Sequence, residues 1–222
     1  DELLFVAASQ INHGGLAAVE DVEQRIMVTN LNLAAGYRAQ EMSDYEAAHS
    51  FFDQGINFLP KGHWNEHYDL SLKLFEAASK CALGIGDATS LKLLSEQIER
   101  YAKTFSDKLT TLYYNCTLLA HTSQLQECSN MSLSVLSQLG ETIPELYSQS
   151  ELNYHIEQTK ALLDDFTNEQ LLEYKAMNDK LKLMAMKFYA RCLLTFVFIK
   201  PEAVPIVVLK MVQLSIARGL AP

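Results

Sequence analysis

The segment His63–His67, which reads HWNEH, is the group of residues whose types and spacing best match a known chemistry. Two imidazoles in an H-x-x-E-H pattern can bind a zinc ion, with Glu66 as the general base of a hydrolase. The segment follows Pro60-Lys61-Gly62, where the preceding helix ends, and so it lies at the start of a helix. A zinc site of this pattern lies in the middle of a helix instead. No third ligand stands out downstream. We therefore keep a zinc hydrolase as an alternative only, and expect Trp64 and Tyr68 to anchor the start of this helix.

Other chemical motifs are absent or incomplete in the sequence. Gly84-Ile85-Gly86 lacks the third glycine of a dinucleotide loop, and neither G-x-x-x-x-G-K-[ST] nor G-x-S-x-G occurs. Cys116 and His121 do not share a helix face well, so we expect a core thiol and a helix-end imidazole. We expect no catalytic residue, no cofactor and no metal in this chain. Under the zinc alternative, the candidate metal ligands are His63 and His67.

Composition and charge disfavour two classes of partner. The chain has 222 residues and a formal net charge of −9. A protein surface that binds nucleic acids or anionic membranes needs clustered Lys and Arg side chains. The most apolar run, Leu193–Ile199, is too short to span a bilayer. The four cysteines lack Cys-x-x-Cys spacing, which favours reduced, mostly buried thiols and a cytoplasmic location.

The elements that must position any site are helices. Apolar residues recur at spacings of three and four, and alternation of apolar with polar residues is rare, so the sequence predicts an all-α fold. Turns that contain Gly, Pro, Ser or Asp separate the helices. The expected helices cover residues 1–12, 16–42, 44–59, 65–83, 88–104, 106–122, 124–139, 148–164, 167–174, 180–200 and 201–218.

Residues 35–60 predict one helix-turn-helix repeat of the tetratricopeptide type. Small residues let the two antiparallel helices approach each other, an aromatic ring fills the groove between them, and a proline ends the second helix. The residues that we expect at these packing positions are Gly36, Ala48, Phe52, Gly55 and Pro60, followed by Trp64 and Tyr68 at the start of the next helix.

Two further hairpins are expected, in degenerate form. Aligning turn with turn places Leu91 and Cys128 where Ala48 lies in the clear repeat. Three hairpins are about the minimum for a stable stack. We expect residues 1–144 to form antiparallel hairpins in a right-handed superhelix, and residues 145–222 to be a C-terminal helical extension of that stack.

Several segments also resemble one group of proteins, namely very large signalling proteins with a kinase-like region, a STAND/AAA-like ATPase, a helical tetratricopeptide-like region, and often GAF and histidine-kinase modules. The segments that carry this resemblance are Asn32–Gly36 with Ala39, Tyr45–Ala48, Gly55–Pro60, Trp64 with His67-Tyr68 and Leu70, Lys200–Glu202, and Val208–Ser215. The resemblance implies that the chain is an internal fragment, and that it carries none of the family's catalytic residues.

From the resemblance and the helical repeat we expect a non-catalytic scaffold that binds a protein or peptide segment, either of a partner or of an adjacent ATPase or kinase domain of the same protein. Tyrosines on the concave face are candidates to line the groove or to pack the repeats. These tyrosines are Tyr101, Tyr113, Tyr114 and Tyr147. The alternatives are a stand-alone adaptor, a spacer that binds nothing, and a sensor that buries a hydrophobic small molecule among Lys180–Met211.

Overall fold

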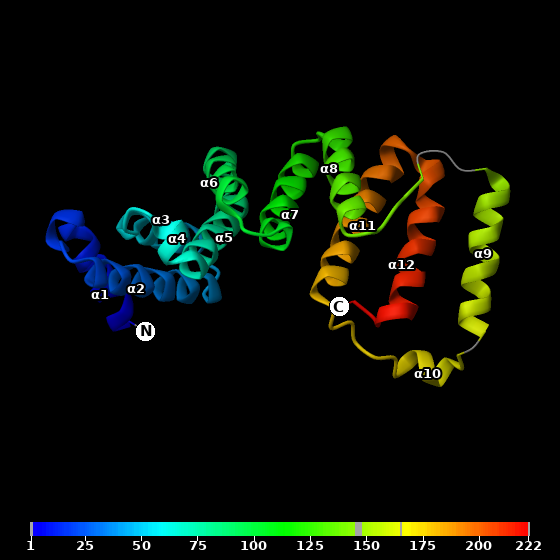
Figure 1. Cartoon of the computed structure of the whole chain (residues 1–222), viewed down its shortest axis with the longest axis horizontal. Coiled ribbons are helices and arrows are strands. Elements are labelled where there is room, and N and C mark those ends of the chain that lie inside the picture. Colours follow the sequence, from blue (N-terminus) through cyan, green and yellow to red (C-terminus); the bar gives the residue numbers. More distant parts are fainter. Residues whose placement is uncertain (1, 145–147, 165, 222) are drawn as a thin grey trace. The chain divides into compact units, whose positions relative to one another are not determined.

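The computed structural model describes residues 2–144, 148–164 and 166–221, and it confirms the all-α fold (Figure 1). Within these ranges there is no strand, although Ala176 and Leu220 form an isolated parallel bridge. None of the helices described here is long and apolar enough to cross a membrane. The elements are α1 (Glu2–Gly14), η1 (Leu16–Ala18), α2 (Val22–Glu41), α3 (Tyr45–Phe58), α4 (His63–Glu66), α5 (Tyr68–Ile85), α6 (Ala88–Tyr101), α7 (Phe105–His121), α8 (Leu125–Gln138), α9 (Gln149–Asp164), α10 (Asn168–Leu172), α11 (Lys180–Ile199), η2 (Pro201–Ala203) and α12 (Val204–Arg218).

Three helical hairpins, α2–α3, α5–α6 and α7–α8, turn with the same backbone motif. One residue of each turn has a positive φ, and the next amide donates to a carbonyl in the last turn of the preceding helix, as in a Schellman motif. The positive φ values belong to Ser43 (62°), Gly86 (77°) and Ser123 (60°). The matching bonds run from Asp44 N to Ala39 O (2.9 Å), from Asp87 N to Ala82 O (2.8 Å) and from Gln124 N to Leu119 O (2.8 Å).

The same spacing relates the buried residues on the two helices of each hairpin. About two helical turns before the turn, each first helix has a small buried residue, and the corresponding residue of the second helix is also buried. These pairs are Gly36 with Ala48, Ser79 with Leu91, and Cys116 with Cys128, the last pair being twelve residues apart. The repeat is therefore visible in the backbone although its side chains differ from one hairpin to the next.

Two helices that the sequence predicts as continuous are interrupted. The expected helix at residues 16–42 is wrong in its first part, because α2 begins at Val22 and the Asp21 side chain caps it by accepting from Gln24 N at 3.0 Å. The expected helix at residues 65–83 is divided at His67, where the backbone leaves the helical region between α4 and α5. In both cases the apolar spacing continues through a backbone break.

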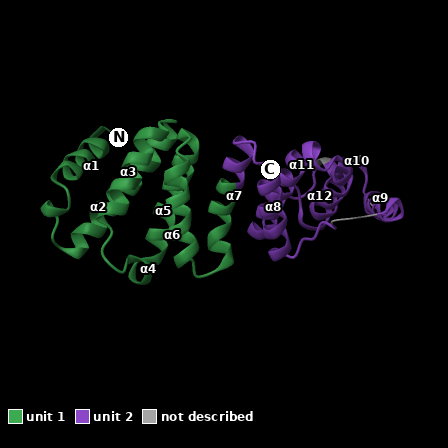
Figure 2. Cartoon of the chain, turned by 90° about the horizontal axis from the view of Figure 1, so that it is seen from above, with its two compact units in different colours: residues 1–115 green, residues 116–222 purple. Residues whose placement is uncertain are grey.

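The chain forms two compact units, Asp1–Asn115 and Cys116–Pro222 (Figure 2). In the first unit, α2 packs on α3, α3 on α5, and α5 on α6. In the second unit, α8 packs on α11, α11 on α12, and α12 on α9, so α11 contacts α8 directly although two helices intervene in sequence. The expected right-handed superhelix of residues 1–144 and its C-terminal extension at residues 145–222 stay predictions.

Candidate functional site

Gly36 and Phe52 form the contact that closes the hairpin α2–α3. A Cβ atom added at Gly36 would lie 2.3 Å from Phe52 Cε1, so the aromatic ring occupies the space that any other residue would need. The Phe52 and Ala48 side chains are fully buried. The Phe52 ring also meets Tyr37 edge to face, with 5.5 Å between centroids. Gly36, Ala48 and Phe52 pack the hairpin, and these three buried residues offer no surface to a ligand.

Gly55 lies where α3 meets α5. A Cβ at Gly55 would lie 3.1 Å from Leu74 Cδ1 on α5, a tighter contact than most real Cβ atoms make. The Gly55 carbonyl accepts a hydrogen bond from Thr29 Oγ1 at 3.3 Å, which ties α3 to α2 as well. Pro60 is buried just beyond the end of α3. The structure thus places Gly55 where three helices meet, and it buries Pro60 directly after α3.

Trp64 and Tyr68 hold the start of α5 against later helices of the first unit. The Trp64 indole is buried and stacks on Tyr101 with 5.4 Å between centroids and 13° between planes. The Tyr68 hydroxyl donates to Asp107 Oδ2 at 2.6 Å and accepts from Lys103 N at 2.8 Å. Tyr101 is thereby a packing partner of Trp64, while Tyr147 lies outside the described residues.

His63, one of the two candidate zinc ligands, has other partners in the structure. His63 Nδ1 makes a 2.8 Å hydrogen bond with Ser71 Oγ, and the His63 ring stacks on Phe75 with 6.0 Å between centroids. Burial, and then the neighbouring His67, lowers the pKa of His63. Within residues 2–144, 148–164 and 166–221, no group of three or more His, Cys, Asp or Glu side chains is arranged to hold a metal ion.

The first unit also carries a half-buried carboxylate that the sequence did not single out. Burial raises the pKa of Glu76 on α5, the hydrogen bond with Thr110 of α7 opposes that rise, and Asp107 adds to it. Among the described residues, no Lys, Arg or His side chain forms an ion pair with Glu76. The charge is therefore only partly compensated by the protein.

Two tyrosines border Glu76. Burial, and next the Glu76 carboxylate, raises the pKa of Tyr37 on α2. The same two causes, burial first, raise the pKa of Tyr114 on α7 to about 12. In the fold α2 contacts α5, and Glu76 of α5 hydrogen-bonds with Thr110 of α7, so the three helices lie beside one another here. We call Tyr37, Glu76, Thr110 and Tyr114 the docking face. Tyr114 was a sequence candidate, whereas Tyr37 and Glu76 were not.

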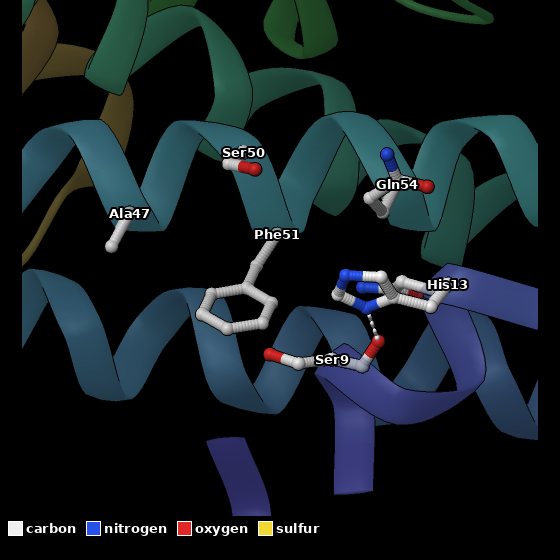
Figure 3. A pocket seen from close by; sticks show the side chains of 7 residues that line it. Ser9, His13, Ala47, Ser50, Phe51 and Gln54 are labelled. Carbon is white, nitrogen blue, oxygen red and sulfur yellow. Dashed lines mark hydrogen bonds between the residues drawn. The ribbon is translucent and has the colours of Figure 1, made fainter. Parts of the chain in front are cut away.

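A separate hollow of about 390 Å³ lies between α1 and α3 in the first unit (Figure 3). Its wall is mostly polar, and His13 Nδ1 makes a 2.6 Å hydrogen bond with Ser9 O of the same helix. The Phe51 ring projects into the hollow from α3 and stacks on Phe5 of α1 with 5.6 Å between centroids. Because its one imidazole is satisfied by its own helix, this hollow presents no arrangement for acid–base chemistry.

An apolar pocket of about 400 Å³ lies in the second unit, between α9, α10, α11 and α12. Among the described residues that line it, the polar side-chain groups are the Ser215 and Tyr174 hydroxyls. The Tyr174 hydroxyl already donates to Ile216 O at 2.5 Å. The pocket includes Met186, Leu193, Val208 and Met211, which lie within the segment where the sequence predicted that a hydrophobic molecule could bind.

Comparisons with known proteins give a partial and distant similarity. No protein-family model matches the chain, and no solved structure gives a significant match. Over 149 residues the chain is 24% identical to the hybrid signal transduction histidine kinase G of Dictyostelium discoideum. The alignment covers 62% of this chain and 4% of that kinase, so the chain spans a small part of the relative's length. The similarity supports a link to signal-transduction proteins and leaves the ATPase part of the resemblance as an expectation.

Proposed function

We propose that this chain is a non-catalytic, protein-binding scaffold of a larger signalling protein, and that the docking face binds a peptide segment with a basic side chain. The observation that carries the proposal is Glu76, a half-buried carboxylate that no cationic side chain of the described residues pairs with. A bound Lys or Arg would compensate this charge with a charge-assisted hydrogen bond.

The groups around Glu76 also suit a basic segment. Tyr37 is exposed and Tyr114 half-buried, and phenol rings attract cations through their faces. The net charge of −9 would favour the approach of a basic partner over an acidic one. The similarity to a hybrid histidine kinase supports a place in a signalling protein. We propose that the segment belongs to a partner or to a neighbouring ATPase or kinase domain of the same polypeptide.

Glu76→Gln should weaken binding of a selected basic peptide at least tenfold, because the substitution keeps the shape but removes the charge and one of the two acceptor oxygens. A charge-assisted hydrogen bond contributes roughly 1.5–3 kcal/mol, and about 1.4 kcal/mol is a tenfold change in Kd. Peptides would be selected from a phage-displayed random library on the wild-type chain, and their Kd values measured by fluorescence anisotropy.

The control for this experiment is Glu99→Gln, which removes one exposed carboxylate from α6 in the same unit. The selected peptides should share a Lys or Arg beside an apolar residue, and Glu99→Gln should bind them as the wild type does. A selection that enriches no sequence, or peptides that bind Glu76→Gln and the wild type equally, would contradict the proposal.

The apolar pocket of the second unit supports a second candidate function, the binding of a small hydrophobic molecule. Its wall is almost wholly apolar, and pockets of this size are typical of small-molecule sites. A ligand bound at this position would contact α11, which packs on α8, so its binding would raise the stability of the second unit.

Leu193→Trp should lower the affinity of the neutral fluorophore N-phenyl-1-naphthylamine at least tenfold, because the larger ring fills the pocket that Leu193 lines. The matched control is Leu194→Trp, since Leu194 is 59% exposed on the same helix and does not line the pocket. Fluorescence titration measures both affinities, and native mass spectrometry of the purified wild type detects a retained ligand. Equal fluorophore affinities for the two variants would exclude this pocket as the site.

A further inference from the structure

All four cysteines are buried and none forms a disulfide, which confirms the expectation of buried thiols. Three of them, Cys116, Cys128 and Cys192, belong to the second unit. Cys116 on α7 and Cys128 on α8 occupy the positions that Gly36 and Ala48 occupy in the first hairpin. Both positions are buried in each hairpin, so the third hairpin has a buried thiol on each of its two helices.

The two thiols contact each other and each other's backbone. Cys128 Sγ donates to the Cys116 carbonyl oxygen at 3.2 Å, and Cys116 Sγ lies 4.0 Å from the Cys128 carbonyl oxygen. The side chains also hydrogen-bond to each other. A disulfide needs the two cysteines side by side, and here each sulfur lies against the other cysteine.

Ser132 is a small residue at the position where the first hairpin has an aromatic ring. It lies sixteen residues after Cys116, as Phe52 does after Gly36 in the first hairpin, where the aromatic ring fills the groove. The Ser132 hydroxyl instead donates to Cys128 O at 2.8 Å and lies 3.6 Å from Cys116 Sγ. No bulky side chain therefore stands between the two thiols at this position.

The two thiols differ in acidity in the way that oxidation chemistry requires. The hydrogen bond from the Cys116 thiol lowers the pKa of Cys128, and the nearby Arg191 guanidinium lowers it further. The same hydrogen bond, with burial, raises the pKa of Cys116. Burial raises the pKa of Cys192 to about 12, so that thiol stays protonated. Cys128 is thus the more acidic thiol of the pair. Its thiolate can attack once it has given up the proton that it donates to Cys116 O, and Cys116 is the thiol beside it.

We propose that Cys116 and Cys128 are an oxidation site, and that hydrogen peroxide converts the pair into a disulfide that links α7 to α8. This inference is independent of the docking face and of the apolar pocket. Disulfides that form in reducing compartments are usually transient and regulatory, and a bond across the helix contact would hold the hairpin closed.

The reaction balances in two steps. The Cys128 thiolate attacks one peroxide oxygen, the O–O bond breaks, and the leaving hydroxide takes a proton to become water, which leaves a sulfenic acid on Cys128. The Cys116 sulfur then attacks the Cys128 sulfur, the S–O bond breaks, and the departing hydroxide takes the Cys116 proton as a second water. Two thiols are oxidised to one disulfide, and one peroxide is reduced to two waters.

Both sulfurs are fully buried, so the peroxide must enter when the hairpin opens locally. We therefore expect oxidation of the native chain to be slow, but specific for one pair. In the chain unfolded in urea, all four thiols are free to react and we expect a mixture of pairings. The distribution of disulfides, rather than the rate alone, distinguishes a built site from ordinary thiol oxidation.

The test is peptide mapping of the native full chain, digested without reduction after exposure to hydrogen peroxide. We expect an intact mass lower by about 2 Da, a single cross-link between the peptides that contain Cys116 and Cys128, and reversal by dithiothreitol. Cys116→Ser should abolish the cross-link and leave a sulfenic acid on Cys128 that dimedone traps. Cys81→Ser and Cys192→Ser should leave the cross-link unchanged.

Three results would overturn the proposal. The first is native oxidation that yields the same mixture of pairings as the urea-unfolded chain, and the second is a dominant cross-link that includes Cys81 or Cys192. The third is over-oxidation of Cys128 to sulfonic acid in the wild type without a cross-link. Circular dichroism of each variant shows whether it is folded, and the wild-type map decides the question even if a variant fails to fold.

Discussion

Phe52→Ala should lower the free energy of unfolding of the first unit by about 3–5 kcal/mol, the range for deleting a fully buried aromatic ring. The ring is fully buried between α2 and α3, and it contacts both Gly36 and Tyr37. Its removal would leave a cavity at the contact that closes the hairpin. The sequence has a single tryptophan, Trp64, in the first unit, so its fluorescence during urea denaturation measures the stability of that unit.

The matched control is Phe198→Ala, which makes the same chemical deletion on a side chain that is 75% exposed on α11. Because that ring loses little contact with protein atoms, we expect a change within about 0.5 kcal/mol. A loss below about 1 kcal/mol for Phe52→Ala would show that Phe52 does not close the hairpin in solution.

Gly36→Ala tests the same contact from the other helix. A methyl group there would lie 2.3 Å from the Phe52 ring, so the single variant should be less stable by roughly 1–3 kcal/mol through overpacking. In the Phe52→Ala background the clash is gone, and the added methyl should cost much less. Additive effects of the two substitutions would contradict a direct contact between these residues.

The packing of the first hairpin was predictable from the sequence because its residue types leave few alternatives. A glycine and an alanine at helix spacing, followed by a phenylalanine and a proline, predict a close helix pair, and Gly36 and Phe52 lie in direct contact. The break before α2 was not foreseen. Residues 16–19 continue the apolar pattern, but Asp21 caps a new helix, and capping by a side chain overrides hydrophobic periodicity over a few residues.

The docking face was largely beyond sequence reasoning. Glu76 is one of many acidic residues on helices, and nothing in its local spacing marks it. Its burial depends on α7, and its neighbours Tyr37 and Tyr114 are far from it in sequence. Such a site arises from packing between helices. By contrast, the alignment of turns placed Cys128 where Ala48 lies, because the positive-φ residue and the capping position repeat along the chain.

Glu141→Ala should lower the free energy of unfolding of the second unit by about 2–4 kcal/mol. The Glu141 carboxylate accepts from Lys182 Nζ at 2.7 Å and from the Tyr189 hydroxyl at 3.0 Å, and so joins the residues that follow α8 to α11. The Lys182 and Glu141 side chains are 20% and 17% exposed. Removing one partner of a fully buried pair costs roughly 3–5 kcal/mol, and the partial exposure here reduces that figure.

Most of this loss would come from the groups that remain. Tyr189 is fully buried, and burial together with Glu141 raises its pKa, so its hydroxyl stays neutral and needs an acceptor. Lys182 would keep only its 3.3 Å hydrogen bond to Leu139 O. Hydrogen exchange followed by mass spectrometry measures the effect, and amides of α8 and α11 should exchange faster in the variant while the Trp64 fluorescence transition of the first unit stays unchanged.

The control is Glu157→Ala, which breaks the exposed pair between Glu157 and Lys160 on α9 of the same unit. Both side chains of that pair are more than half exposed, and such pairs contribute about 0–1 kcal/mol because water solvates each charge. If the amides of α8 and α11 exchanged as slowly in Glu141→Ala as in Glu157→Ala, the Glu141 carboxylate would not join these helices. Their contact would then depend on the apolar residues between them alone, such as Phe188 and Leu136, which are fully buried.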